Sequence, residues 1–188
     1  MTTFHYFAYG SNMLVERLAA RCPSARRLDV VVAGDHTVDF LKRGTDGSGK
    51  AGLVRTKGER VFGVLFEIAK AEREALDRYE GPGYHRIDDF QIVAPHASKP
   101  IVAATYVPRA TELGLRPYDW YLQLVVAGCE QSLLPDDYTD RLRRMAFVVD
   151  PEPARSAARE ARAILSRCQI PIALAHGERT AAANPEPL

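Results

Sequence analysis

The stretch FAYGSNM, residues 7–13, leads from an apolar segment into Gly10, Ser11 and Asn12 and then into a helical pattern. A strand that merely ends could use many other turn residues. Glycine allows a close backbone approach, and Ser and Asn favour a helix N-cap, where backbone N–H groups lack partners within the helix. Anions bind at such turns. We therefore expect an anion-binding site at this junction of strand and helix.

The composition is that of one globular domain with a sizeable core. The chain has 188 residues, of which 46% are hydrophobic and 26% charged, and its net charge is +1. A charge so close to zero predicts neither a nucleic-acid partner nor binding to a membrane surface. Apolar runs are too short to span a membrane, and the chain begins with a strand rather than a signal segment. We expect a cytoplasmic protein.

The residue types that most often bind metals are dispersed along the chain. Cys22, Cys129 and Cys168 lie far apart without CxxC spacing, and the histidines are also scattered. Neither a disulfide framework nor a zinc site is indicated. We expect no metal and no cofactor.

Hydrophobic periodicity predicts alternating strands and helices. Strands are expected at 4–9, 28–33, 36–42, 51–56, 60–68, 85–93 and 100–107. Helices are expected at 13–21, 70–80, 118–131 and 136–147. Turn signals at Gly34-Asp35 and Lys57-Gly58-Glu59 place hairpins between neighbouring strands. Because hairpins give antiparallel pairs, we predict an α+β fold with a largely antiparallel sheet and not a doubly wound one.

One Gly-rich stretch has the form of a phosphate-binding loop. GTDGSGK, residues 44–50, fits G-x-x-x-x-G-K, but Ala51 follows where a Ser or Thr would bind magnesium. The next residues read as a strand, whereas the motif requires a helix. We interpret this stretch as a hairpin connection.

The stretch LDRYEGPGYHR, residues 76–86, places a carboxylate at the end of a helix, because Gly-Pro-Gly stops the helix after Glu80. The helix dipole is negative at that end, so it favours a raised pKa for the carboxyl group. Such a group can take up and return a proton near neutral pH. The alternative is a solvated acid that pairs with Arg78 or Arg86.

Four sequence blocks occur in the order and spacing of one known family: YFAYGSNM, GKAGLVRTKGERVFGVLFEI, LDRYEGPGYHRI and YLQLVVAGCEQSLLPDDYTDRL. Over roughly residues 4–147 the chain resembles the gamma-glutamylcyclotransferase family, which has an AIG2-like fold. The resemblance implies a small, mainly antiparallel, barrel-like sheet flanked by helices. It also implies an enzyme that cyclises a small-molecule γ-glutamyl substrate to 5-oxoproline and releases an amine.

The resemblance also implies the site. The catalytic residue would be Glu80. The substrate-binding residues would be Tyr9, Gly10, Ser11, Asn12, Met13 and Tyr121. From its position alone, Tyr121 follows Trp120 on an expected helix, where an aromatic side chain is more often part of the core.

Cyclisation explains why a carboxyl group is needed. The substrate's α-amine is mostly ammonium at pH 7 and must lose a proton before it attacks the δ-carbonyl. The departing nitrogen must then gain one, so Glu80 can act as base and then as acid. Ser11 lacks the G-x-S-x-G context of a nucleophile and is not needed as one.

Other interpretations stay open at this point. Arg86 is a candidate for binding a substrate carboxylate or for pairing with Asp88 or Asp89, and Arg43 has a similar status. A non-catalytic module that binds γ-glutamyl or anionic ligands could use the same turn. A cyclotransferase that acts on a carrier-bound intermediate could use the same chemistry.

The chain after Pro151 differs in kind. We expect an Ala/Arg-rich helix to about Cys168 and a loose tail from Gly177 to Leu188. The expected domains are a catalytic domain at 1–148 and a C-terminal helical extension with its tail at 149–188. The helix has an apolar stripe that must be buried on the same chain or across a homodimer. The stripe comprises Ala158, Ala161, Leu165 and Cys168.

Overall fold

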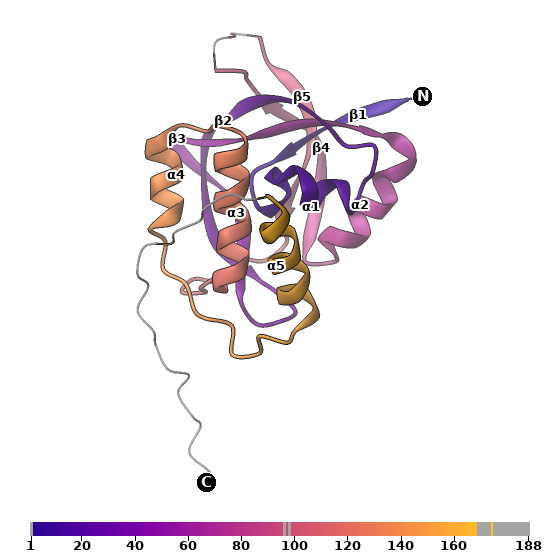
Figure 1. The fold of residues 1–188 in the computed structure, drawn as a ribbon. Coiled ribbons are helices and arrows are strands. Elements are labelled where there is room, and N and C mark those ends of the chain that lie inside the picture. Colours follow the sequence, from indigo (N-terminus) through magenta and orange to yellow (C-terminus); the bar gives the residue numbers. More distant parts are fainter. Residues whose placement is uncertain (1, 96, 98, 169–173, 175–188) are drawn as a thin grey trace.

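A five-stranded sheet forms one side of the molecule (Figure 1). The computed structural model describes residues 2–95, 97, 99–168 and 174. The strands are β1 (Thr3–Ala8), β2 (Arg26–Arg43), β3 (Gly49–Ala69), β4 (Tyr84–Ile92) and β5 (Ile101–Pro108). Their order in the sheet is β2-β3-β1-β5-β4. Among these described strands only β1 and β5 pair in parallel, which confirms the mainly antiparallel α+β class.

The sheet curves without closing. Its edge strands are β2 and β4. Val32 of β2 and Val93, just after β4, form an isolated antiparallel bridge with N···O distances of 2.8 and 3.0 Å. The sheet therefore curves like a barrel, but apart from this one bridge the described edge strands β2 and β4 do not pair with each other.

The two predicted hairpin turns are wrong, because β2 and β3 each run through them. The strands pair with each other from Arg26↔Glu67 to Arg43↔Gly49, with a register shift after Gly34. At that shift Asp35 has φ 54°, and the N–H of Gly58, which has φ 83°, donates to the Asp35 carboxylate at 2.8 Å. These residues make an irregularity where both strands bend, because turn residues also suit a bulge.

The true turn of this hairpin is the Gly-rich stretch after β2. The N–H of Gly44 donates to the carbonyl of Ser48 at 2.8 Å, and β3 begins at Gly49. The interpretation of residues 44–50 as a hairpin connection is therefore confirmed.

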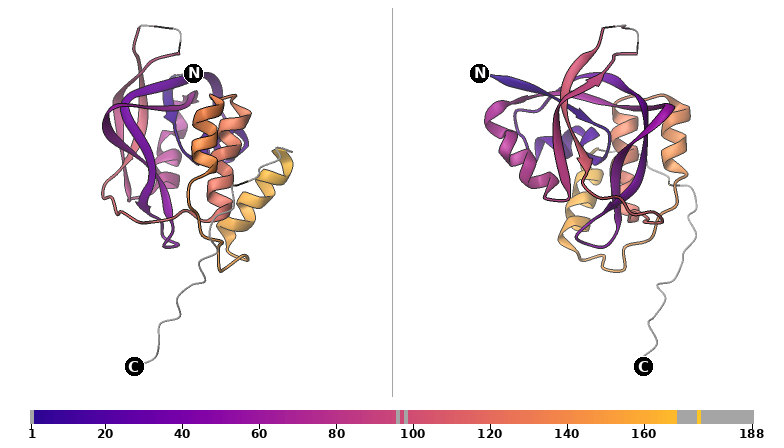
Figure 2. Two further views of the ribbon diagram at one scale, coloured as in Figure 1. Left: turned by 90° about the vertical axis from the view of Figure 1, so that its left-hand side faces the viewer. Right: turned by 180° about the vertical axis from the view of Figure 1, so that it is seen from behind.

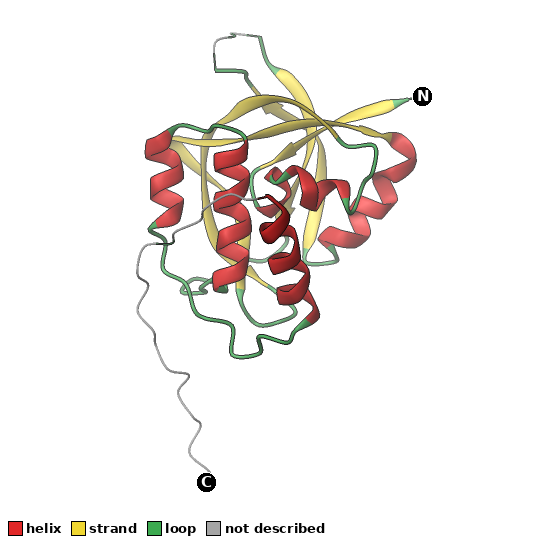
Figure 3. Ribbon diagram, viewed as in Figure 1, coloured by secondary structure: helices red, strands yellow, loops and turns green. Residues whose placement is uncertain are grey.

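Helices α3, α4 and α5 stand together on one face of the sheet (Figures 2 and 3). The helices are α1 (Val15–Ala19), α2 (Arg73–Glu80), α3 (Asp119–Gln131), α4 (Asp136–Arg143) and α5 (Ser156–Cys168). Short 3-10 turns, η1 (Ser11–Met13) and η2 (Lys70–Glu72), precede α1 and α2. The expected helix at 13–21 is thus shorter and begins with a 3-10 turn, and the one at 136–147 ends early.

The C-terminal helix packs within the chain, against α3 and α1. Its side chains Ala158, Ala161 and Ile164 are buried, whereas Leu165 and Cys168 are half-buried against the core. The predicted apolar stripe is therefore covered by other parts of the same chain. The expected tail at 177–188 lies outside the described residues. No described helix has the length and apolar character needed to cross a membrane.

Helix α3 approaches the η1 turn at Gly128. A Cβ atom on Gly128 would lie 2.7 Å from Met13 Cβ and 2.8 Å from the backbone N of Leu14. Met13 and Leu14 are both fully buried, so neither can move aside easily. Because Gly128 has no side chain, helix α3 can pack directly against the backbone of the η1 turn.

Gly128→Ala should destabilise the protein by about 1 to 3 kcal/mol through overpacking, although alanine has the higher helix propensity. The free energy of unfolding in urea measures this. Gly34→Ala is the matched control, since its Cβ would meet nothing within 4 Å. Equal unfolding midpoints for the two variants would contradict the close approach described here.

Candidate active site

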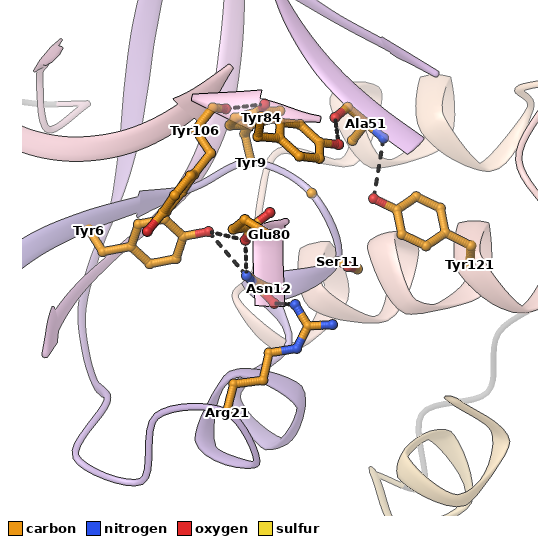
Figure 4. A pocket seen from close by; sticks show the side chains of 11 residues that line it. Tyr6, Tyr9, Ser11, Asn12, Arg21, Ala51, Glu80, Tyr84, Tyr106 and Tyr121 are labelled. Atoms are coloured by element: carbon orange, nitrogen blue, oxygen red, sulfur yellow. Dashed lines mark hydrogen bonds between the residues drawn. The ribbon is translucent and has the colours of Figure 1, made fainter. Parts of the chain in front are cut away.

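A small cavity lies where the η1 turn meets the end of α2 and strands β1, β4 and β5 (Figure 4). Its volume is about 40 Å³. Its lining consists of Tyr6, Tyr9, Gly10, Ser11, Asn12, Arg21, Ala51, Glu80, Tyr84, Tyr106 and Tyr121. Almost every side chain that lines it is polar or aromatic.

The structure brings most of the predicted site residues to this cavity. Those present are Tyr9, Gly10, Ser11, Asn12, Glu80 and Tyr121. Met13 is not part of the lining, because its side chain is fully buried beneath the turn next to Gly128. Met13 anchors the turn from below.

The turn itself offers backbone donors. The N–H of Met13 donates to the Gly10 carbonyl at 3.0 Å, and the N–H groups of Gly10, Ser11 and Asn12 form no hydrogen bond with another described residue. A Cβ on Gly10 would lie 3.0 Å from Ala51 Cβ. Glycine is therefore needed for the close approach to β3, and the free N–H groups can serve an anion.

Glu80 is the last residue of α2, and Gly81, with φ 75°, ends the helix. The Asn12 amide Nδ2 donates to Glu80 Oε1 at 2.7 Å, and the Tyr6 hydroxyl lies 3.3 Å from the same oxygen. Among the described residues no arginine forms an ion pair with this carboxyl group. The alternative of a solvated acid paired with Arg78 or Arg86 is therefore wrong.

The surroundings of Glu80 set its protonation. Burial has the largest effect and raises the pKa of the carboxyl group above its ordinary value. The charge of Arg21, the hydrogen bond from Tyr6 and the charges of Arg17 and Lys42 act against this rise. The direction of the shift brings Glu80 closer to exchanging a proton at neutral pH.

The tyrosines keep their protons. Burial raises the pKa of Tyr6, Tyr9 and Tyr84 well above the usual value, and also that of Tyr121. Tyr84 donates to the Ala51 carbonyl at 2.6 Å, and the Ala51 N–H donates to the Tyr121 hydroxyl at 3.2 Å. The tyrosines that line the cavity are thus neutral, and hydrogen bonds to Ala51 hold Tyr84 and Tyr121 in place.

Ser11 has an arginine as its side-chain partner. Arg17 Nε donates to Ser11 Oγ at 3.1 Å. Arg17 is buried, and burial together with the charge of Arg21 lowers its pKa to about 10. A guanidinium group has no lone pair with which to take a proton, so this contact cannot activate Ser11 as a nucleophile.

The other two candidate arginines, Arg86 and Arg43, form ion pairs within the chain. Arg86 forms ion pairs with Asp77 and, at 2.8 Å, with Asp88, so of its two predicted roles the structural pair is present. Arg43 pairs with Glu112 at the surface. Neither group is free to meet a ligand carboxylate.

A second, more open cavity adjoins the first and shares Tyr84 and Tyr106 with it. Its volume is about 660 Å³. Arg78 and Arg109 line it, and neither forms an ion pair with a described residue. Arg109 Nε donates to the Tyr84 carbonyl at 3.1 Å, so this cation is attached to the shared wall.

The sequence did not predict several lining residues: Tyr6, Arg21, Ala51, Tyr84 and Tyr106. Two of them have a local signal in the sequence. Tyr6 lies in the strand that runs into the turn, and Tyr84 directly follows the Gly-Pro-Gly that ends the helix after Glu80. Within the described residues, no group of three or more His, Cys, Asp or Glu side chains is placed to hold a metal ion.

Comparison with known proteins finds sequence similarity to one protein family. A family model described as AIG2-like family matches residues 60–142. The chain is 30% identical over 148 residues to a gamma-glutamylcyclotransferase of Homo sapiens, covering 75% of this chain and 78% of the relative. The gamma-glutamylcyclotransferase of Mus musculus gives 30% identity over 149 residues with the same coverage of 75% and 78%.

A solved structure of a gamma-glutamyl cyclotransferase superposes with a TM-score of 0.78 at 25% identity. The match covers 88% of this chain and 99% of the other. The similarity therefore extends from the sequence to the three-dimensional fold.

Glu80→Gln should stabilise the protein at neutral pH. Because the pKa of Glu80 is raised in the folded chain, the unfolded chain ionises first as the pH rises through the ordinary value of 4.5. The wild type therefore loses stability from that pH up to the folded pKa, and the variant does not. We expect the difference in Tm, variant minus wild type, to grow as the pH rises above the ordinary value of 4.5 and to level off once Glu80 is ionised in the folded chain as well.

Glu74→Gln is the control for this titration, because Glu74 is exposed on the same helix. This variant removes a carboxyl group from the same helix outside the cavity, so it measures the effect on Tm of a Glu-to-Gln change away from the site. A Glu80→Gln variant that becomes relatively less stable as the pH rises would show that the folded chain favours ionised Glu80.

Proposed function

The chain belongs to the gamma-glutamylcyclotransferase family and is an enzyme of this type, and from this premise we propose its reaction and the residues that carry it. The reaction is intramolecular aminolysis of a small γ-glutamyl compound. The α-nitrogen forms a bond to the δ-carbon, the bond from that carbon to the leaving nitrogen breaks, and 5-oxoproline and a free amine result. The observation that carries the proposal is the half-buried Glu80, whose carboxyl group faces a turn with free N–H groups.

The turn would bind the anionic parts of the substrate. The N–H groups of Gly10, Ser11 and Asn12 suit the α-carboxylate or the oxyanion that develops on the δ-carbonyl oxygen. Because the attack is intramolecular, holding the glutamyl chain in a folded conformation supplies much of the rate, about 7 to 11 kcal/mol in well-oriented model reactions. Tyr9 and Tyr121, with neutral hydroxyl groups, would form the walls against which it folds.

Glu80 would move the proton. As a carboxylate it removes a proton from the α-ammonium group, which frees the lone pair that attacks the δ-carbon. It then donates that proton to the departing nitrogen as the carbon–nitrogen bond breaks. The α-nitrogen in the new ring still carries one proton more than the lactam needs. Glu80, again a carboxylate, takes this second proton and passes it to the released amine, which leaves as an ammonium ion. A raised pKa supports both steps, because the same group must be a base first and an acid second.

The second cavity would receive the leaving amine. It adjoins the first at Tyr84 and Tyr106 and presents Arg78 and Arg109 without ion-pair partners among the described residues. Unpaired cations favour a leaving group that carries a carboxylate. We therefore expect γ-glutamyl amino acids to be better substrates than neutral γ-glutamyl amines.

Release of 5-oxoproline from γ-glutamyl amino acids, γ-glutamyl amines and glutathione tests the reaction. Glu80→Gln should lower kcat at least about a hundredfold, as loss of a general acid–base group does. Glu74→Gln, exposed on the same helix, should keep wild-type kcat.

The outcomes separate the alternatives. Full activity in Glu80→Gln would contradict the role of Glu80. Binding of γ-glutamyl ligands without any turnover would favour a non-catalytic binding module. Turnover only of γ-glutamyl groups attached to a carrier would favour the carrier-linked reaction.

Arg109→Gln tests the assignment of the leaving-group side. It should raise KM about two- to fivefold for a γ-glutamyl amino acid, the size expected for one exposed ion pair. KM for a neutral γ-glutamyl amine should not change, which controls for effects through the Tyr84 carbonyl. Equal changes for both substrates would place the leaving carboxylate elsewhere.

A further inference from the structure

Arg21 reaches the cavity without touching the carboxyl group that the reaction needs. It follows α1, and its guanidinium NH1 donates to Asn12 Oδ1 at 2.9 Å. Asn12 Nδ2 in turn donates to Glu80 Oε1 at 2.7 Å and to the Tyr6 hydroxyl at 3.1 Å. Figure 4 shows the Asn12 amide lying between the guanidinium group and the carboxyl group.

The chemistry of arginine decides which way this amide faces. Arginine has five N–H donors and no acceptor, so only the oxygen of the Asn12 amide can meet Arg21. The amide nitrogen must then face Glu80. Rotating the amide by half a turn would bring its oxygen to the carboxyl group, where it could pair only with protonated Glu80. The guanidinium thus selects the orientation that suits a carboxylate.

The amide also keeps the cation at a distance from Glu80. Arg21 forms no ion pair with any described residue, and its charge is the largest influence that opposes the effect of burial on Glu80. A guanidinium in direct contact would hold the carboxyl group strongly acidic and make it a poor proton donor. Separation by one amide allows the carboxylate to form and still allows it to be protonated.

Arg21 is held in place by α2, the same helix that carries Glu80. Its guanidinium lies over the ring of Tyr79, 5.2 Å from the centroid, and its Nε is buried without a hydrogen-bond partner among the described residues. Tyr79 is 55% exposed and precedes Glu80 in the chain. Stacking accounts for the position of this exposed ring and fixes the guanidinium.

We propose that Arg21 is a positioning residue of the reaction, acting through Asn12 to hold Glu80 as the base that accepts the substrate's proton. This inference rests on the proposed function. Several groups face Glu80 from the elements packed against it: Tyr6 of β1, Tyr9 just after β1, Asn12 of η1, Arg17 of α1, Arg21 and Cys22 after α1, Lys42 of β2, Tyr84 of β4, Tyr106 of β5 and Tyr121 of α3.

Arg21→Met tests the proposal, because methionine keeps an unbranched apolar stem beside Tyr79 but has no donor and no charge. The kcat should fall about 10- to 100-fold, as for a misplaced catalytic group, while KM changes little. The acid limb of the pH–kcat profile should move up by about one pH unit. The Glu80 carboxyl group, followed by ¹³C NMR in the full chain without substrate, should titrate at correspondingly higher pH.

Arg73→Met is the matched control. Arg73 lies over the Phe4 ring at the same 5.2 Å and pairs with Asp88, but it does not line the cavity. Its loss should lower Tm without moving the acid limb. Arg21→Lys keeps the charge and should return the acid limb toward the wild-type position.

An Arg21→Met variant with wild-type kcat and an unchanged Glu80 titration would overturn the proposal and leave Arg21 as a stacking residue. Should that variant not fold, Arg21→Gln, which keeps an amide donor without charge, must show the same upward shift of the Glu80 titration. A wild type that releases no 5-oxoproline would instead defeat the proposed function, and the NMR titration would still decide whether Arg21 acts on Glu80.

Discussion

Helix α3 has no side chain at Gly128, and the buried turn that begins with Ser11 occupies the space a side chain would need. The same turn meets β3 on its other side, where Gly10 lies against Ala51. Backbone groups wedged between a helix and a strand cannot shift without displacing buried side chains. Because the backbone of the turn is fixed in this way, the Asn12 side chain points toward Glu80. For the same reason the N–H groups of the turn stay without hydrogen-bond partners among the described residues.

The pKa of the Glu80 carboxyl group is set by effects that oppose each other. Burial makes the charged form of Glu80 costly, whereas Arg17, Arg21 and Lys42 make it less so, and none of these cations pairs with it directly. A direct ion pair would give a stable carboxylate, and burial alone would give a stable acid. Under the proposed mechanism Glu80 takes up a proton and returns it during one turnover, and neither extreme suits that role. Cations held at a distance from the carboxyl group keep its pKa between the two.

The sequence predicted the parts of the structure that depend on neighbouring residues and missed those that depend on distant pairing. The turn at Gly10, Ser11 and Asn12 and the helix end at Glu80 each have signals in consecutive residues, and both line the cavity. Asp35 and Gly58 also gave strong turn signals, yet the same positive-φ preference serves a bulge inside two long strands. Tyr106 and Arg21 have no local signal, because strand pairing between β1 and β5 and the fold of the loop after α1 bring them to the site.

Running the reaction in ¹⁸O-labelled water tests cyclisation most directly. If the substrate's own amine attacks, the carbonyl oxygen of the product comes from the substrate. Mass spectrometry should then find unlabelled 5-oxoproline in amounts equal to the released amine. Glutamate carrying one ¹⁸O atom as the main product would show that water attacks the δ-carbon, and intramolecular aminolysis at this site would be refuted.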